Sequence, residues 1–422
     1  MSAAVTWFDP WSPAFVADPY PAYARLRAAG RAHWFERSGQ WLIPHHADVS
    51  ALLRDRRLGR TYLHRFTHEE FGRTPPCPEH EPFRTLDSHG LLEMEPPDHT
   101  RIRRLVSKAF TPRTVQRLVP TVRRLAGELA EELYERGGGD LISLFAEPLP
   151  VAVIAEMLGV PHADRGLLRP WSADIVAMFE LNPSEETARR AVRASAEFSD
   201  YLRELIAERR RSPGEDLISG LITAQEDPEV WREAPHRKGG GGRQEGRLTE
   251  QEMVSTCVLL LNAGHEATVN TTANGWLTLF RDPDRLAALR AEPKALLPTA
   301  VEELMRYDTP LQMFERWVLD DIEIGGQVIP RGSEVALLFG SANRDPARFP
   351  HPDRLDLTRA DNPHITFGGG VHYCLGAPLA RLELAASFGA LLERAPGLHL
   401  AEEPERKPGY VIRGLEELIV EV

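Results

Sequence analysis

Cysteine is scarce in this sequence of 422 residues, which contains only Cys77, Cys257 and Cys374. Three widely spaced cysteines exclude a disulfide framework, and their odd number favours a reducing compartment. The sequence also opens without the basic and apolar regions of a secretory signal. We therefore expect a cytoplasmic protein.

Long hydrophobic runs are also missing. The most apolar stretch, residues 253–263, is interrupted by Asn262, His265 and Glu266 before it could span a bilayer. The 50 Lys and Arg residues are outnumbered by 62 Asp and Glu residues, which gives a net charge of −12. An acidic chain without an apolar span is expected to bind neither a membrane nor nucleic acid in general.

Helical periodicity dominates residues 97–310, whereas strand patterns are few. Hairpins are predicted at residues 33–43 and 322–329, and the sequence "SEVALLF" that follows is expected to continue the second sheet. The fold class is therefore mainly α with a small, mostly antiparallel β portion. We expect a single domain over residues 1–422, with its β-rich portion mainly at 33–60 and 311–340.

One long helix is predicted between a flexible loop and residue 280. Consecutive glycines make residues 236–247 a flexible loop, and Thr249 with Glu252 three positions later forms a capping box. A helix from there to Phe280 would be roughly 45 Å long, enough to cross a domain. A helix of this length favours a scaffold for a buried site.

The stretch "FGGGVHYCLG", residues 367–376, places Cys374 just before a predicted helix. Its glycines permit positive φ and close approach of a flat partner, and the helix N-terminus stabilises the thiolate that ligates metals. An inert buried cysteine remains an alternative. A phosphate loop would need a following Gly-Lys-Ser/Thr, and a nucleophile would need a better-placed base than His372. The residues alone slightly favour a metal–thiolate site.

The same stretch resembles the haem-ligand signature of the cytochrome P450 superfamily, Phe-Gly-x-Gly-x-His-x-Cys-x-Gly, at each fixed position. The resemblance implies the P450 fold, with the long central helix over a buried haem b (iron protoporphyrin IX). It implies that Cys374 is the axial thiolate ligand of the iron, with Phe367 and Gly368 beside the sulfur. Such a thiolate donates electron density to the iron.

The resemblance also implies cationic partners for the haem propionates. Buried carboxylates need such partners, and the positions that match the family's set are His99, Arg103, Arg316 and His372. A second matching set is Glu303, Arg306 and Arg359, for which the family pattern implies a buried charge network that holds the cysteine loop. We assign this second set a structural role.

The predicted long helix contains "LLLNAGHEATVN". Ala263 and Gly264 are small enough for a porphyrin edge and dioxygen to approach, and Glu266 is the candidate for proton supply. Ala267 stands where the family usually has a threonine, and Thr268 lies about 100° further round the helix, so it cannot simply substitute. Our hypothesis is that an ordered water or a substrate hydroxyl completes a proton relay with Glu266.

Residues 101–117 contain six basic side chains and no acid. The family places the corresponding helix on the cysteine side of the haem, so an acidic electron donor such as a ferredoxin is expected to dock there. The electrons are expected to come from NAD(P)H through redox partners. The six side chains are Arg101, Arg103, Arg104, Lys108, Arg113 and Arg117.

Family position also implies a substrate pocket. It would draw on the loop 61–95 and on mostly apolar side chains, with Asn262 and Gln312 as polar anchors, which favours a mid-sized lipophilic substrate, a product of secondary metabolism. The other candidates are Met178, Phe179, Leu260, Ala263, Leu311, Met313 and Ile412.

The resemblance therefore implies a haem–thiolate monooxygenase that hydroxylates or epoxidises an organic compound. Two alternatives stay open at this point. The same fold could carry out peroxide-driven, reductive or rearrangement chemistry, or it could bind haem as a sensor or carrier without turnover. Dependence on a reductase and dioxygen, and formation of a product, separate these alternatives.

Overall fold

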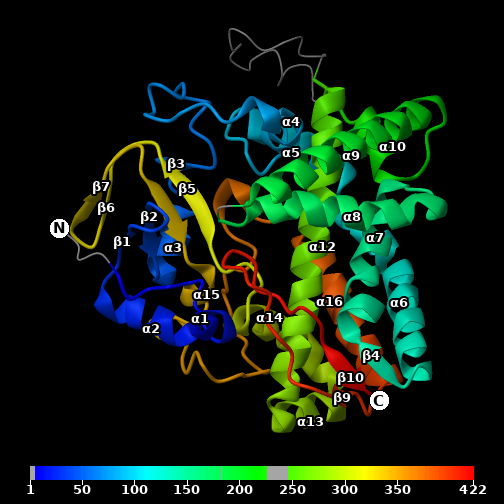
Figure 1. Cartoon of the computed structure of the whole chain (residues 1–422). Coiled ribbons are helices and arrows are strands. Elements are labelled where there is room, and N and C mark those ends of the chain that lie inside the picture. Colours follow the sequence, from blue (N-terminus) through cyan, green and yellow to red (C-terminus); the bar gives the residue numbers. More distant parts are fainter. Residues whose placement is uncertain (1–4, 182, 226–245) are drawn as a thin grey trace. The chain divides into compact units, whose positions relative to one another are not determined.

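The computed structural model describes residues 5–181, 183–225 and 246–422, and within them the chain is mainly helical (Figure 1). The chain divides into two compact units. The first, here called the sheet unit, comprises Met1–Thr74, Val122–Pro150 and Glu266–Val422. The second, the helical unit, comprises Pro75–Thr121 and Val151–His265. That residues 1–422 form a single domain stays a prediction. The predicted loop 236–247 lies outside the described residues except for Gly246 and Arg247.

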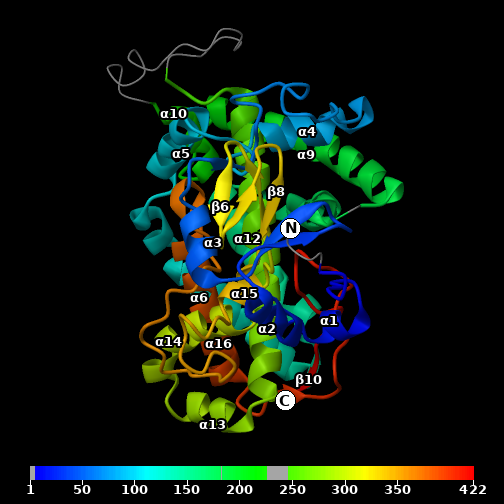
Figure 2. The same cartoon turned by 90° about the vertical axis from the view of Figure 1, so that its left-hand side faces the viewer.

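Helix α12, Glu250–Phe280, is the long helix that the sequence predicts (Figures 1 and 2). The N–H of Thr249 donates to Oε2 of Glu252 at 2.8 Å, and the N–H of Glu252 donates to Oγ1 of Thr249 at 3.2 Å. The predicted capping box and the predicted end at Phe280 are thus confirmed. At 31 residues the helix is about 46 Å long. It continues from the helical unit into the sheet unit between His265 and Glu266.

The largest sheet has five strands in the order β1–β2–β8–β5–β3. β2 and β8 are parallel, and the other neighbours are antiparallel. Helix α3, His46–Leu52, packs on this sheet, and Val49 and Leu52 join the sheet's side chains in one core (Figure 2). The strands are β1 His33–Phe35, β2 Gln40–Ile43, β3 Leu58–Gly59, β5 Phe314–Val318 and β8 Glu334–Leu337.

Both predicted hairpins are confirmed. β1 and β2 pair antiparallel, and so do β6, Ile322–Ile324, and β7, Gln327–Ile329. The prediction that "SEVALLF" continues the second hairpin is wrong, because β8 pairs with β2 and β5 instead. The physical reason is burial: Val335 and Leu337 of β8 are fully buried in the core of the five-stranded sheet.

The third sheet was not predicted. Its order is β4–β10–β9, with β4 Gly138–Asp140, β10 Ile419–Glu421 and β9 His399–Leu400. A Cβ on Gly138 would lie 2.2 Å from the carbonyl oxygen of Val420, so this strand pairing requires glycine. The glycines after helix α6, Pro112–Glu135, therefore end the helix and also form a strand.

The remaining helices belong to one or the other unit. In the helical unit α8 packs on α9, whose N-cap Ser184 accepts the N–H of Thr187 at 3.1 Å and whose last turn is basic. The helices wholly within that unit are α4 Glu81–Ser88, α5 Asp98–Ala109, α8 Arg165–Val176, α9 Glu185–Arg211 and α10 Leu217–Thr223, whereas α6, α7 (Pro148–Leu158) and α12 lie partly in each unit. The sheet unit adds α1 Pro13–Ala17, α2 Tyr20–Ala29, α13 Pro283–Ala291, α14 Pro293–Tyr307, α15 Phe339–Ala342 and α16 Ala377–Arg394.

Candidate active site

Cys374 lies in a closed loop that leads into α16; residues 365–376 are called the cysteine loop below. The N–H of Gly368 donates to the carbonyl of Ile365 at 2.8 Å, and the N–H of Cys374 donates to the carbonyl of Phe367 at 3.0 Å. The cysteine is half-buried, and its Sγ lies 3.9 Å from where a Cβ on Gly376, the N-cap of α16, would be. The sulfur therefore sits over the start of a helix, where the macrodipole favours a thiolate.

The aromatic ring of Phe367, a residue of the cysteine loop, lies next to polar side chains. The guanidinium of Arg381, on α16, lies 4.5 Å from the centre of the ring, and the ring of Tyr373 lies edge-on at 6.4 Å. Arg381 donates to both carboxylate oxygens of Glu302 on α14, at 2.6 and 2.9 Å, and His364 Nε2 lies 3.0 Å from the same carboxylate. Burial alone would raise the pKa of Glu302, but the hydrogen bonds with His364 and Arg381 outweigh it and hold the pKa at about 2.

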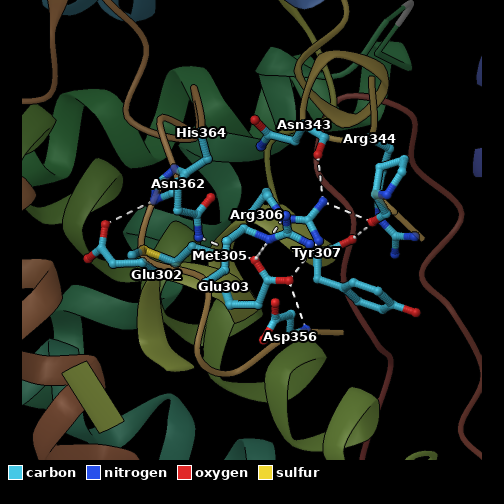
Figure 3. A network of polar contacts seen from close by, with 12 residues as sticks. Glu302, Glu303, Met305, Arg306, Tyr307, Asn343, Arg344, Asp356, Asn362 and His364 are labelled. Carbon is cyan, nitrogen blue, oxygen red and sulfur yellow. Dashed lines mark hydrogen bonds and ion pairs between the residues drawn. The ribbon is translucent and has the colours of Figure 1, made fainter. Parts of the chain in front are cut away.

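The predicted charge network is brought together in the sheet unit, and Figure 3 shows its members Glu303 and Arg306. Glu303 and Arg306 are both fully buried on α14, and Nε and Nη2 of Arg306 donate to the two carboxylate oxygens of Glu303, each at 2.8 Å. Nε of Arg359 donates to Glu303 at 3.0 Å. Because a buried charge left without its partner costs about 3–5 kcal/mol, these three side chains depend on one another.

Asn343 connects this network to the cysteine loop, a link that the sequence did not suggest. Its backbone carbonyl accepts Nη1 of Arg306 at 2.8 Å. Its side chain accepts the N–H of Ile365 at 2.9 Å and donates to Oγ1 of Thr366 at 3.0 Å. Thr366 in turn donates to the carbonyl of Met305 on α14 at 2.9 Å. The loop therefore reaches the charged core through two residues directly before Phe367.

The predicted propionate partners are divided between the two units. Arg316 lies on β5 with only 4% of its surface exposed, and its Nη1 donates to the carbonyl of Glu315 at 2.8 Å. His372 lies half-buried in the cysteine loop. His99 is buried and Arg103 is half-buried one turn later on α5, in the helical unit. A buried guanidinium in the unit that carries Cys374 suits a site for an anionic group.

Helix α12 is mostly buried, but two of its alanines are exposed. Ala263 and Ala267, four residues apart, are exposed, and Leu260 is half-buried one turn before Ala263. Gly264 is packed against α7, because a Cβ there would lie 3.1 Å from the side chain of Ile154. Its small size accommodates α7, and a role toward a cofactor stays a prediction. Asn262 is buried, and its Oδ1 has no partner in the described part of the chain.

The predicted proton-handling residues follow on the same helix. Glu266 is half-buried, and its carboxylate accepts Nδ2 of Asn270 at 3.1 Å. Thr268 is buried, whereas the carbonyl of Ala267 accepts Oγ1 of Thr271 at 2.6 Å. Asn270 and Thr271 were not singled out from the sequence, although their i+4 spacing from Glu266 and Ala267 could have drawn attention to them.

The predicted pocket residues have different environments. Leu311 and Ile412 are half-buried and joined by a β-bridge, and Met178 and Phe179 are half-buried in the 3-10 turn Ala177–Phe179. Met313, in contrast, is fully buried.

Gln312 is bonded at both ends of its amide. It accepts the Tyr23 hydroxyl at 3.0 Å and donates to the carbonyl of Thr309 at 2.7 Å. Both ends of the amide are thus held by protein groups, and its role as a substrate anchor stays a prediction.

Comparison with known proteins identifies the family. The family model "Cytochrome P450" matches residues 167–395. The cytochrome P450 monooxygenase PikC of Streptomyces venezuelae is 40% identical over 414 residues, which are 96% of this chain and 91% of that protein. The chain belongs to the cytochrome P450 family. It is a cytochrome P450 monooxygenase, an oxidoreductase of the P450 fold whose family implies a haem cofactor and electrons from a redox partner.

Two other similar proteins support this assignment of the P450. The 6-deoxyerythronolide B hydroxylase of Saccharopolyspora erythraea is 36% identical over 97% of each chain. The solved structure of P450BioI with a hexadec-9Z-enoic acid ligated acyl carrier protein has a TM-score of 0.86, at 35% identity over 97% of this chain and 99% of that one. Among the described residues of this P450, no helix has the length and apolar character to cross a membrane.

The residues of the sheet unit fit a haem. The half-buried thiol of Cys374 lies over a helix N-terminus, which suits a ligand that must be a thiolate. The almost fully buried guanidinium of Arg316 is a cation of the kind that binds a carboxylate such as a propionate. The exposed Ala267 of α12, in the same unit, has no polar group on its side chain. A sulfur that can bind the iron, together with a cationic group that can bind a propionate carboxylate, suits an iron porphyrin.

Proposed function

We propose that Cys374 is the thiolate ligand of a haem b in this P450, and that Arg316 and His372 bind its propionates. The supporting observation is the position of the Cys374 sulfur over the first turn of α16, in a loop fixed by the Glu303 and Glu302 networks. When bound, the haem supplies the binding and reductive activation of dioxygen. The assignment of His99 and Arg103 to the propionates, and of Phe367 and Gly368 to the sulfur, stays a prediction from the family pattern.

The reaction that we propose is hydroxylation or epoxidation of a mid-sized lipophilic compound. The half-buried apolar side chains of Leu311 and Ile412, which a β-bridge joins, support an apolar substrate. A relative that acts in polyketide biosynthesis, and the structure of a relative with an acyl chain, support the same class. Free hexadec-9Z-enoic acid is the first probe, and a low-to-high spin change of the ferric haem measures its binding. If neither it nor other lipophilic compounds in a broad screen cause that change, this substrate class is wrong.

Relatives that are named as monooxygenases and hydroxylases favour this reaction over peroxide-driven or rearrangement chemistry and over a sensor without turnover. We also propose a cytoplasmic location, supported by the few cysteines of the chain. Fractionation of the producing cells tests it, and recovery outside the cytoplasm contradicts it.

Proton delivery is assigned to Glu266, with a water or a substrate hydroxyl in place of the usual threonine. The support is the exposed Ala267, which has no hydroxyl, beside a half-buried carboxylate. Ala267→Thr should then change the coupling of NADPH consumption to product by less than about threefold, because the substrate already fills this role. Product and NADPH are measured together on the natural substrate. A large gain in coupling would contradict substrate assistance.

A ferredoxin-like acidic donor, itself reduced by NAD(P)H, is proposed to dock on the basic stretch of the helical unit. Arg104, Lys108, Arg113 and Arg117 are exposed there, whereas Arg101 forms an ion pair with Glu252 and lends the surface no net charge. Arg104→Glu with Lys108→Glu should slow reduction of the haem by such a donor about tenfold at low salt, since both charges would become repulsive. Substrate binding should be unchanged. Equal reduction rates would refute docking at this surface.

A further inference from the structure

Glu266, the proposed proton donor, is tied back to its own helix by Asn270. Nδ2 of Asn270 donates to the backbone carbonyl of Glu266 at 2.9 Å and to its carboxylate Oε2 at 3.1 Å. One amide group thus holds both the carbonyl and the side chain of the same residue. An asparagine inside a helix commonly turns to solvent or bonds only the carbonyl four residues earlier. Here the second bond fixes the orientation of a carboxylate.

Asn270 is itself fixed from the other side. The residue is 2% exposed, and a Cβ on Gly414 would lie 2.2 Å from its Oδ1. Only a glycine at position 414 allows the backbone of the C-terminal segment to come so close. With Oδ1 against Gly414, the Nδ2 end of the amide is directed at Glu266. The position of the carboxylate is therefore set by two contacts in series, both within the sheet unit.

The segment around Gly414 is anchored on α12 by a second asparagine, one turn further along. Nδ2 of Asn274 donates to the carbonyl of Arg413 at 2.9 Å, and its Oδ1 accepts Nη1 of Arg406 at 2.5 Å. Asn274 thus supports the same segment, but no contact joins it to Glu266 among the described residues. It is a natural control for Asn270. The adjacent Ile412 is a proposed pocket residue, so the segment that seats Asn270 also borders the proposed substrate site.

We propose that Asn270 is the positioning residue for Glu266, directing its carboxylate for proton delivery in a P450 that lacks the usual hydroxyl at position 267. This inference rests on the proposed role of Glu266. Ala267 has no group that could orient the acid, and the hydroxyl of Thr271 is bonded to the carbonyl of Ala267 at 2.6 Å. The amide of Asn270 is therefore the polar group that holds the Glu266 carboxylate on this helix.

The test compares the holoenzyme with Asn270→Ala, Asn274→Ala, Glu266→Gln and the double variant Asn270→Ala/Glu266→Gln. NADPH consumption and hydrogen peroxide release are measured in H2O and in D2O, with free hexadec-9Z-enoic acid as the probe and a plant-type ferredoxin with its reductase as the donor. Asn270→Ala should slow turnover about threefold to tenfold, which is the rate equivalent of losing one hydrogen bond of ordinary strength, and raise the solvent isotope effect. Asn274→Ala should change the turnover rate and the solvent isotope effect by less than about twofold. The double variant should be no slower than Glu266→Gln, because both of its substitutions act through the Glu266 carboxylate. A crystal structure of Asn270→Ala should show the Glu266 side chain rotated.

The outcomes separate this inference from the function on which it rests. If Glu266→Gln is as fast as the unmodified enzyme, the proposed role of Glu266 fails, and this inference fails with it. If Glu266→Gln is slow but Asn270→Ala is not, the role of Glu266 stands and the inference is overturned. If Asn270→Ala and Asn274→Ala slow turnover equally, with the same isotope effect, both residues merely support packing, and the inference is again overturned.

Discussion

Gly370→Ala should reduce the haem content of the purified protein by at least about tenfold, a loss that corresponds to only 1.4 kcal/mol of binding free energy. Gly370 has φ +67°, and a Cβ there would lie 2.2 Å from the backbone carbonyl oxygen of Leu53. The neighbour is backbone at the end of α3, so it cannot turn aside as a flexible side chain would. The cysteine loop would have to shift, and Cys374 follows four residues later. Haem content per polypeptide is the measurement.

Gly368→Ala is the matched control. Gly368 lies in the same loop with the same φ of +67°, but a Cβ there would meet nothing within 4 Å. It carries only the cost of an L-residue in the left-handed region, about 1–2 kcal/mol. We expect a lower unfolding temperature with haem largely retained. If the two variants retain equal amounts of haem, the contact with Leu53 does not fix the loop, and the account of its anchoring is wrong.

Local signals in the sequence predicted a large part of the fold. The capping box at Thr249, the end of α12 at Phe280 and both hairpins depend on residues a few positions apart, and the structure has each of them. The spacing of Glu303 and Arg306 likewise predicted that they share a helix face. Such features are encoded within one or two turns of chain, so a pattern can reveal them.

Contacts between distant segments could not be predicted in this way. The strand β8 follows a hairpin in sequence but pairs with β2, some 290 residues earlier, because its apolar residues complete that core. Nothing in the sequence next to Asn343 marks it as the link between Arg306 and the cysteine loop. The same holds for Gly414, whose contact with Asn270 depends on how a C-terminal segment lies on α12.

Charge patterns in the sequence were informative only in part. The stretch 101–117 has six bases and no acid, yet Glu252 of α12 pairs with Arg101 and removes one of the six from the surface. Glu302 precedes Glu303 and drew no attention, although its bonds with Arg381 and His364 hold the loop residue Phe367 between them. Local charge counts cannot reveal partners from other helices.

Ligation of haem iron by Cys374 is the central claim, and its loss should have the largest effect on activity. Cys374→Ala removes the only side-chain sulfur of the cysteine loop, whereas Cys77 is exposed just before the 3-10 helix Pro78–His80 and Cys257 is buried in α12, where burial raises its pKa to about 12. Burial thus disfavours the thiolate of Cys257, and Cys77 lies outside the cysteine loop. We expect product formation to fall to background and Cys257→Ala to keep its activity.

The most direct measurement is the absorption spectrum of the reduced protein with carbon monoxide. The unmodified protein and the Cys257→Ala control should show the red-shifted band of a thiolate-ligated haem, and Cys374→Ala should lack it. Persistence of that band in Cys374→Ala, or its absence from the unmodified haem-loaded protein, would contradict the account.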